Sequence, residues 1–221
     1  MMHIIHPTAK IHPLAYLDPT TNITVHAGAE IGAFTVVGTR GEFRREGEKN
    51  GNVIIGKNTV IREQCTIQIS IEGNATYIGE DCYIMNKSHI AHDVIIEDNT
   101  TISTGSLIGG YCKIGKSVNL GLGAIIHQRL EIGNGVMVGM GSVITKNVPP
   151  YLTIAGSPAK IMGINQRGME RAGLDTDKIS NLQENLNMTL KLSGNYMENE
   201  YANNMANFIK NYDKVLTEMI K

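Results

Sequence analysis

Residues 94–121, VIIEDNTTISTGSLIGGYCKIGKSVNLG, place an aliphatic residue at every sixth position. The spacing continues on both sides of this stretch through twelve consecutive positions: Ile78, Ile84, Ile90, Ile96, Ile102, Ile108, Ile114, Leu120, Ile126, Ile132, Val138 and Ile144. Two positions before each of them the residue is small or β-branched, except at Leu130. A period of six matches neither an amphipathic helix nor a simple alternating strand. It indicates short strands that turn a corner after every hexad.

Three such hexads predict a triangular coil of about 18 residues, and coils stack at about 4.8 Å, the ordinary strand spacing. The same beat begins at Ile5, resumes at Val25 and runs again from Ile55. We therefore predict an all-β fold, a parallel β-helix of hexapeptide repeats, over residues 1–162. Gly or Asn is expected at the corners, where φ is positive.

Two segments interrupt the period. GTRGEFRREGEKNGN (38–52) is polar and rich in glycine, which predicts a loop that leaves the coil at one corner. KNVPPYLTIAGSPAKIMG (146–163) ends the period, because paired prolines cannot donate to a further coil. Beyond it, residues 163–221 carry spaced apolar positions and predict a C-terminal helical domain of two or three helices that caps the open end.

Composition limits the classes of function. The net charge is −1 and the pI is about 6.7, so no basic field indicates binding to nucleic acid or to an anionic membrane. No apolar run of about 18 residues and no export signal is present, which predicts a cytoplasmic protein without stable membrane insertion. Cys65, Cys82 and Cys112 lack metal-ligand spacing, and we expect reduced thiols that fill the core.

Polar residues interrupt the regular repeat in NKSHIAHDV (86–94). With about 18 residues per coil, His92, Gly110 and Gln128 fall in one column, and His127 lies about 10 Å higher on the same edge. Gly110 is expected to leave open space above His92 and to present its backbone N–H there. A histidine beside a carboxylate, here Asp93, is the minimum for a general base near neutral pH.

Simpler interpretations compete with this one. A lone corner histidine, such as His12 or His26, is expected to be an ordinary solvated side chain. His89, His92 and His127 could instead hold zinc, since three protein ligands are typical of a catalytic zinc site. The spacing across the corner is poor for that purpose, and the column places Gly110 rather than a histidine over His92. We therefore predict no metal.

Five stretches together resemble one family: HPTAKIHP (6–13), FRREGE (43–48), SHIAHDV (88–94), GLGAIIHQ (121–128) and VPPYLTIAGSPAKIMGINQRGMERAG (148–173). Over roughly residues 3–173 the chain resembles the acyl-carrier-protein–UDP-N-acetylglucosamine O-acyltransferases, which start lipid A synthesis. The resemblance implies left-handed winding and a homotrimer with active sites between subunits. It also implies transfer of a (3-hydroxy)acyl group from acyl-carrier protein to the 3-position of a UDP-N-acetylglucosamine-type sugar. No cofactor is implied beyond the donor substrate, acyl-ACP or acyl-CoA.

The resemblance also assigns roles to residues. His92 is the expected general base, Asp93 supports its orientation, and the Gly110 N–H stabilises the oxyanion. Contacts to substrates are implied for eight residues: Arg44, Gln68, His89, His127, Gln128, Met140, Asn165 and Arg171.

Several positions depart from the family pattern. Gln68 and Tyr111 stand where histidines are common, and Arg167 replaces a glutamate, which leaves the nucleotide sugar open. Met140 falls at the hydrocarbon ruler, where a methionine would close the groove and favour a shorter acyl chain, unless it only fills a gap. A sugar N-acyl- or N-acetyltransferase using acyl-ACP or acyl-CoA, a zinc lyase or hydratase, and a non-catalytic scaffold remain as alternative functions.

Overall fold

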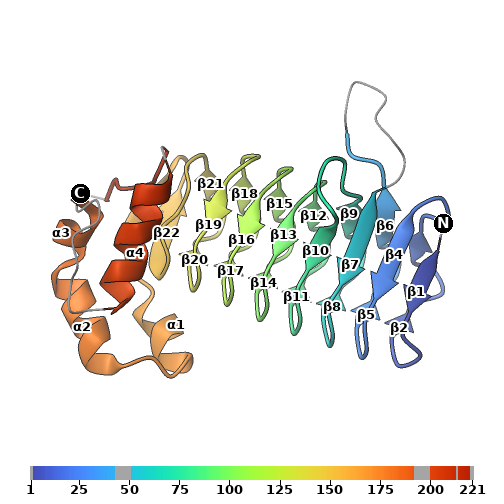
Figure 1. Cartoon of the computed structure of the whole chain (residues 1–221), viewed down its shortest axis with the longest axis horizontal. Helices are drawn as coiled ribbons and strands as arrows, with labels where there is room; N and C mark the ends of the chain where they lie inside the picture. Colours follow the sequence, from blue (N-terminus) through green and yellow to red (C-terminus); the bar gives the residue numbers. More distant parts are fainter. Residues whose placement is uncertain (1, 43–50, 192–199, 213, 220–221) are drawn as a thin grey trace.

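The computed structural model describes residues 2–42, 51–191, 200–212 and 214–219. Within them the strands wind into one solenoid with three faces, and the helices gather at the end remote from the N-terminus (Figure 1). Sheet A contains β1 (His3–Ile5), β4 (Asn22–Val25), β7 (Asn52–Ile55), β10 (Thr76–Ile78), β13 (Ile95–Ile96), β16 (Lys113–Ile114) and β19 (Glu131–Ile132). Sheet C contains β3 (Tyr16–Leu17), β6 (Val36–Thr39), β9 (Thr66–Gln68), β12 (His89–Ile90), β15 (Leu107–Ile108), β18 (Ile125–Ile126) and β21 (Val143–Ile144).

Sheet B forms the third face and extends furthest towards the helices. It contains β2 (Lys10–Ile11), β5 (Glu30–Ile31), β8 (Val60–Ile61), β11 (Tyr83–Ile84), β14 (Thr101–Ile102), β17 (Asn119–Leu120), β20 (Met137–Val138), β22 (Leu152–Gly156) and β23 (Ala159–Ile164). All pairings in the three sheets are parallel except that of β22 with β23. The chain passes from sheet A to B to C and back to A, which confirms the predicted parallel β-helix.

The aliphatic residues that recur at every sixth position form the core of this solenoid. Ile78 pairs with Ile96, and Ile96 with Ile114, so equivalent positions of successive coils lie in register as predicted. Every one of the twelve predicted aliphatic positions is at most 2 % exposed. The three cysteines are also buried and unpaired, as expected of core fillers. Burial of this continuous apolar column is the main favourable term in folding.

Gly or Asn stands at several corners with positive φ, as expected, for example Asn58, Asn99, Gly105 and Gly123, but other corners differ. Asp93, Tyr111 and Arg129 occupy equivalent positions at the corner between sheets C and A, with φ of 58°, 61° and 61°. Left-handed backbone costs roughly 1–2 kcal/mol for a residue with a Cβ. Hydrogen bonds between coils hold it in place, for example from the Tyr111 N–H to the His92 carbonyl at 3.0 Å. The hydrogen bonds between coils therefore outweigh the preference of this backbone conformation for glycine.

Four helices follow the solenoid within the described residues, rather than the two or three predicted. They are α1 (Gln166–Arg171), α2 (Thr176–Glu184), α3 (Leu186–Lys191) and α4 (Glu200–Asn211). The first and third have six residues each, too few to display a helical period in the sequence. Residues after α4 return to the solenoid, where Val215 bridges to Asn147 and Met219 to Ile161. None of the helices in the described ranges is long and apolar enough to cross a membrane.

The end of the solenoid and the start of the loop each lie about two residues later than predicted. β23 continues through residue 162 to Ile164, and α1 begins at Gln166. The loop predicted over residues 38–52 begins after Thr39, because β6 includes Gly38 and Thr39. Residues 43–50 of that loop lie outside the described residues.

Candidate active site

His92 and Asp93 form a pair at the corner between sheets C and A, directly after β12. The His92 Nδ1 atom lies 2.9 Å from Asp93 Oδ2, and the two side chains are 11 % and 4 % exposed. A carboxylate at Nδ1 favours the tautomer that keeps its proton there and leaves Nε2 unprotonated. The predicted dyad is therefore assembled by two consecutive residues of one corner.

Asp93 is held by backbone N–H groups of the coil below. Oδ2 accepts from Ile71 at 2.9 Å, and Oδ1 accepts from Gly73 at 2.6 Å and from Glu72 at 3.2 Å. Burial alone would raise the pKa of this carboxyl, but the three N–H groups together with His92 lower it below the ordinary value. Asp93 is thus anionic at neutral pH and fixed in place.

The segment that holds Asp93 is an insertion into the repeat. Thr66 pairs with His89 on the coil above, and His89 in turn pairs with Leu107, so the first of these coils is longer than the second by five residues. In the sequence, the insertion is visible as an interruption of the six-residue period between Ile67 and Ile78. The sequence alone does not show that these residues hold Asp93. Residues 71–73 belong to the candidate site, and the sequence analysis missed them.

The imidazole of His92 lies between two glycines. A Cβ on Gly110 would meet the ring Cε1 and Nε2 atoms at 2.6 and 2.7 Å, and a Cβ on Gly41 would meet Cδ2 at 2.8 Å. The expectation of open space above His92 was therefore wrong, because the ring itself fills the volume that Gly110 leaves. Any side chain at either position would displace the ring.

Gln68 supports the dyad from the coil below. It is 5 % exposed, and its Oε1 accepts the His92 backbone N–H at 3.2 Å. The residue predicted as a substrate contact thus holds the main chain of the predicted base. His89 lies nearby, half-buried, with Nδ1 2.6 Å from the Thr66 hydroxyl. Burial lowers the pKa of His89, which keeps it neutral at pH 7.

Other predicted site residues lie away from the dyad. His127 and Gln128 are exposed at the same corner on higher coils, and the His127 Nδ1 lies 3.1 Å from the Gln128 carbonyl. Met140 is 75 % exposed at the corner between sheets B and C. Within the described residues, no group of three His, Cys, Asp or Glu side chains could hold a metal ion. Arg44 lies outside the described residues.

Asn165 and Arg171 lie on the first helix, at the far end of the solenoid. Asn165 caps α1 by accepting the Gly168 N–H at 3.1 Å, and its amide donates to the Gly135 carbonyl at 2.9 Å. Arg171 Nε donates to the Arg167 carbonyl at 3.2 Å. Neither residue meets His92 within one chain.

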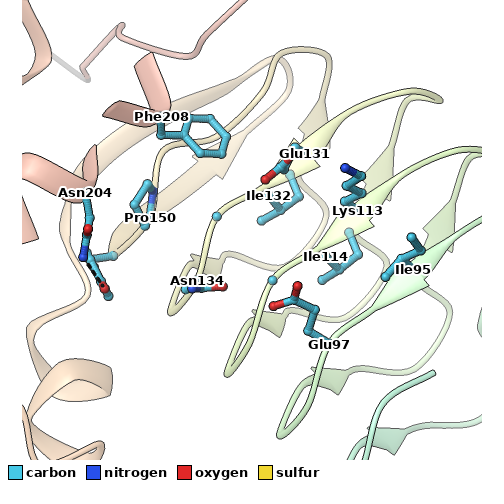
Figure 2. Close-up of a pocket in the computed structure, with 13 residues that line it drawn as sticks. Ile95, Glu97, Lys113, Ile114, Glu131, Ile132, Asn134, Pro150, Asn204 and Phe208 are labelled. Carbon is cyan, nitrogen blue, oxygen red and sulfur yellow. Dashed lines mark hydrogen bonds between the residues drawn. The ribbon is translucent and has the colours of Figure 1, made fainter. Parts of the chain in front are cut away.

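A cavity of about 400 Å³ lies elsewhere, on the outer face of sheet A beneath α4 (Figure 2). Lys113 and Glu131 of the sheet line it together with Asn204 and Phe208 of the helix. None of the predicted site residues that the structure describes lines this cavity, so it adds nothing to the dyad.

Comparison with known proteins follows the same division of the chain. Residues 75–110 match the family model described as bacterial transferase hexapeptide (six repeats), and residues 147–215 match UDP N-acetylglucosamine O-acyltransferase, domain 2. The acyl-carrier-protein–UDP-N-acetylglucosamine O-acyltransferase of Paraburkholderia phytofirmans is 31 % identical over 82 % of this chain and 81 % of that protein. The enzyme of the same name from Helicobacter pylori is 33 % identical over 64 % of this chain, and the match spans only 53 % of that relative.

Solved structures agree with these matches. The crystal structure of the UDP-N-acetylglucosamine O-acyltransferase of Moraxella catarrhalis superposes with a TM-score of 0.72 at 26 % identity. That superposition covers 97 % of this chain and 99 % of the other. The similarity therefore includes both the solenoid and the helices beyond it.

Replacing Asp93 by Asn should lower the free energy of unfolding at pH 7 by about 1–3 kcal/mol, because the three N–H groups lose their charged acceptor. The pKa of this carboxyl is lowered by folding, so its contribution is present above the ordinary value of about 3.9 and is lost as the pH falls towards the lowered value. Urea unfolding at pH 7, 5 and 3 measures the difference.

The gap between wild type and Asp93→Asn should therefore shrink as the pH falls below about 4. Asp177→Asn, at an exposed position on α2, is the control for the change of charge. An equally large gap at every pH would contradict the role given to the Asp93 carboxylate.

Proposed function

Because the chain belongs to the acyl-carrier-protein–UDP-N-acetylglucosamine O-acyltransferase family, we propose that it acylates the 3-position of a UDP-N-acetylglucosamine-type sugar from an acyl-ACP donor. The chain is an acyltransferase by family. The observation that carries the proposed chemistry is the His92–Asp93 pair, whose Nδ1 is held at 2.9 Å from a fixed carboxylate. Cytoplasmic location stays a prediction.

In the proposed reaction His92 Nε2 accepts the proton of the sugar 3-hydroxyl while the oxygen attacks the thioester carbon. A C–O bond forms, and the carbonyl electron pair moves onto its oxygen. The Gly110 N–H, beside the imidazole, stabilises this oxyanion, a contribution of about 3 kcal/mol in other enzymes. The intermediate then collapses, the C–S bond breaks, and the departing thiolate takes the proton back from the imidazolium.

Asp93 supports this cycle electrostatically. Its carboxylate stays anionic because backbone N–H groups hold it, so it stabilises the imidazolium without accepting its proton. Gln68 fixes the His92 main chain. We propose that His89, His127 and Gln128, along the same edge, contact the sugar or acyl group, and that Arg44, Asn165 and Arg171 contact the nucleotide.

His92→Ala should lower kcat/KM by about 100-fold or more, since a positioned general base contributes that much. Mass spectrometry of products from acyl-ACP and UDP-N-acetylglucosamine measures it. His26→Ala, at an exposed corner, is the matched control and should keep full activity. If His92→Ala left turnover unchanged, the result would contradict general-base catalysis by His92 and would favour a non-catalytic scaffold.

A second candidate is N-acylation of an amino-sugar nucleotide from acyl-ACP or acyl-CoA. Gln68 and Tyr111, which stand where the family commonly has histidines, leave the nucleotide sugar open. The same assay separates the two reactions when run with a 3-amino nucleotide sugar: ester products are cleaved by mild alkali, whereas amide products survive.

We further propose that the protein is a homotrimer with left-handed coils. Outer positions of sheet C carry exposed apolar residues, namely Tyr16 at 50 %, Leu107 at 44 % and Ile125 at 42 %. Outer positions of sheet B instead include Lys10, Glu30, Thr101 and Asn119. Leu107 and Ile125 lie side by side on neighbouring strands, and exposed apolar residues that gather on one face are typical of a surface that packs against another chain.

Ile125→Asp should convert the trimer to monomers, because an unpaired carboxylate would be buried in the interface. Sedimentation equilibrium measures the mass of the assembly. Thr101→Asp, which makes the same charge change on the outer face of sheet B, should leave the trimer intact. A wild type of monomeric mass would refute the proposed assembly.

Met140→Gly should move donor preference towards longer acyl chains. Met140 is 75 % exposed, and the family resemblance places it at the hydrocarbon ruler, where a methionine is expected to shorten the groove. Competition between acyl-ACPs of different length, read by mass spectrometry, gives the preference. Met162→Gly, at an exposed methionine on β23, should leave the preference unchanged. An identical chain-length profile for Met140→Gly and wild type would contradict this role.

A further inference from the structure

On the two coils above Asp93, the equivalent corner positions are occupied by Tyr111 and Arg129. Asp93, Tyr111 and Arg129 occupy the same place on three successive coils and share the same left-handed backbone conformation. The Tyr111 N–H donates to the His92 carbonyl at 3.0 Å, and the Arg129 N–H donates to the Gly110 carbonyl at 2.8 Å. The coil ladder therefore fixes the position of each of these side chains relative to His92.

Tyr111 packs directly on the imidazole. The centroids of the Tyr111 and His92 rings are 4.9 Å apart, and the ring planes make an angle of 85°. This T-shaped contact is a favoured arrangement for aromatic rings. The Arg129 guanidinium in turn covers the Tyr111 ring, with its central carbon 4.0 Å from the ring centroid, as in a cation–π contact.

The hydroxyl of Tyr111 contributes little to this arrangement. It is enclosed and lies close to the Glu72 carboxylate. Burial and the nearby Asp93 and Glu72 carboxylates raise the pKa of Tyr111, so the hydroxyl keeps its proton at neutral pH. The part of Tyr111 that meets the imidazole is its ring.

We propose that Tyr111, steadied by Arg129, is a positioning residue for His92. The imidazole is bounded by the Gly41 and Gly110 backbones, is tied at Nδ1 by Asp93, and meets the Tyr111 ring as a further boundary. A general base must be held close to its productive geometry, and a misplacement of about 1 Å can cost about 100-fold in rate. Arg129 acts through the tyrosine rather than on the substrate.

The first part of the test measures turnover and therefore rests on the proposed function. Tyr111→Phe keeps the ring and should retain kcat within about twofold, because the ring contact with the imidazole is preserved. Tyr111→Leu should lower kcat about tenfold, with KM for both substrates within about twofold, because the base is misplaced while the binding surface persists.

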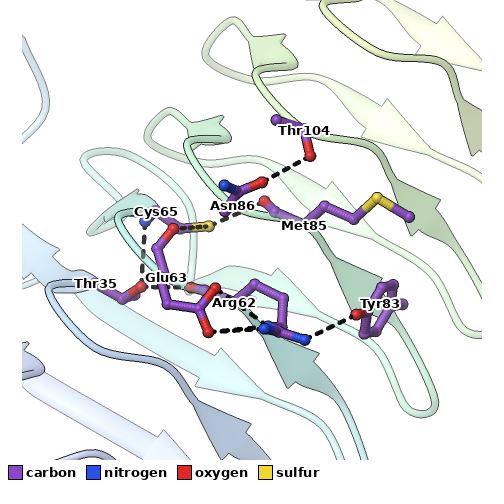
Figure 3. A network of polar contacts seen from close by, with 8 residues as sticks. All are labelled: Thr35, Arg62, Glu63, Cys65, Tyr83, Met85, Asn86 and Thr104. Carbon is purple, nitrogen blue, oxygen red and sulfur yellow. Dashed lines mark hydrogen bonds and ion pairs between the residues drawn. The ribbon is translucent and has the colours of Figure 1, made fainter.

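A double-mutant cycle tests the place of Arg129. Arg129→Met should lower kcat by about threefold to tenfold in the wild type and cause no further loss in Tyr111→Leu, as expected of residues that act as a unit. The control is the Arg62–Tyr83 pair on sheet B, where the Arg62 Nη1 donates to the Tyr83 hydroxyl at 3.3 Å (Figure 3). Arg62→Met and Tyr83→Leu should leave kcat unchanged.

A second arm does not depend on turnover. Diethyl pyrocarbonate acylates neutral imidazoles, and peptide mapping gives its rate at His92. Tyr111→Leu should speed this modification several-fold, whereas Tyr111→Phe should not. If wild type transfers no acyl group from any donor, the proposed function fails and this arm still decides the positioning role.

Three results would overturn the proposal. Equal losses in Tyr111→Phe and Tyr111→Leu would identify the hydroxyl as the working group. A higher KM for the nucleotide sugar in Arg129→Met, persisting in Tyr111→Leu, would make Arg129 a direct substrate contact. An unchanged rate of His92 modification in Tyr111→Leu would remove the contact that positions the ring.

Discussion

Hydrogen bonding between successive coils is the constraint on which the rest of the structure depends. Each short strand donates to the coil above it, as the Tyr77 N–H does to the Val94 carbonyl at 2.9 Å, and this repeats along all three faces. The ladder sets a fixed register between coils and thereby turns distance along the sequence into height along the solenoid. It also holds residues such as Asp93 and Tyr111 in a left-handed conformation that they would not adopt alone.

Features that follow from register and burial could be predicted from the sequence. The core beat, the parallel winding, the buried cysteines and the place of His92 beneath Gly110 all follow from the period of six, whereas the pairing of His92 with Asp93 was indicated by their adjacency in the sequence and by the family resemblance. Side-chain packing could not be predicted in the same way. The free space above His92 was expected because Gly110 lacks a side chain, but periodicity alone says nothing of where the imidazole turns, and it turns into that space. The two shortest helices escaped prediction because six residues complete fewer than two turns.

Rigidity of the surroundings explains how so few residues build the candidate site. His92 is restricted from several sides. The Asp93 carboxylate holds its ring, the Gln68 amide holds its main chain, and the backbones of Gly41 and Gly110 limit where the ring can move. Most of these groups belong to the ladder or are held by it, so little entropy remains to be lost when the imidazole takes up a proton. Loops on a rigid scaffold commonly carry function, and here the scaffold itself supplies most of the positioning.

The five-residue insertion before β10 is what makes this corner unlike the others. In a regular coil the strand N–H groups are consumed by the carbonyls of the next coil, so no cluster of donors is available to a side chain. The N–H groups of Ile71, Glu72 and Gly73 leave the ladder where the extra residues bulge, and all three turn to one carboxylate. That carboxylate then remains anionic although Asp93 is only 8 % exposed, because charge-assisted hydrogen bonds offset its desolvation. An interruption of the repeat thus provides the fixed negative charge that the imidazole above it requires.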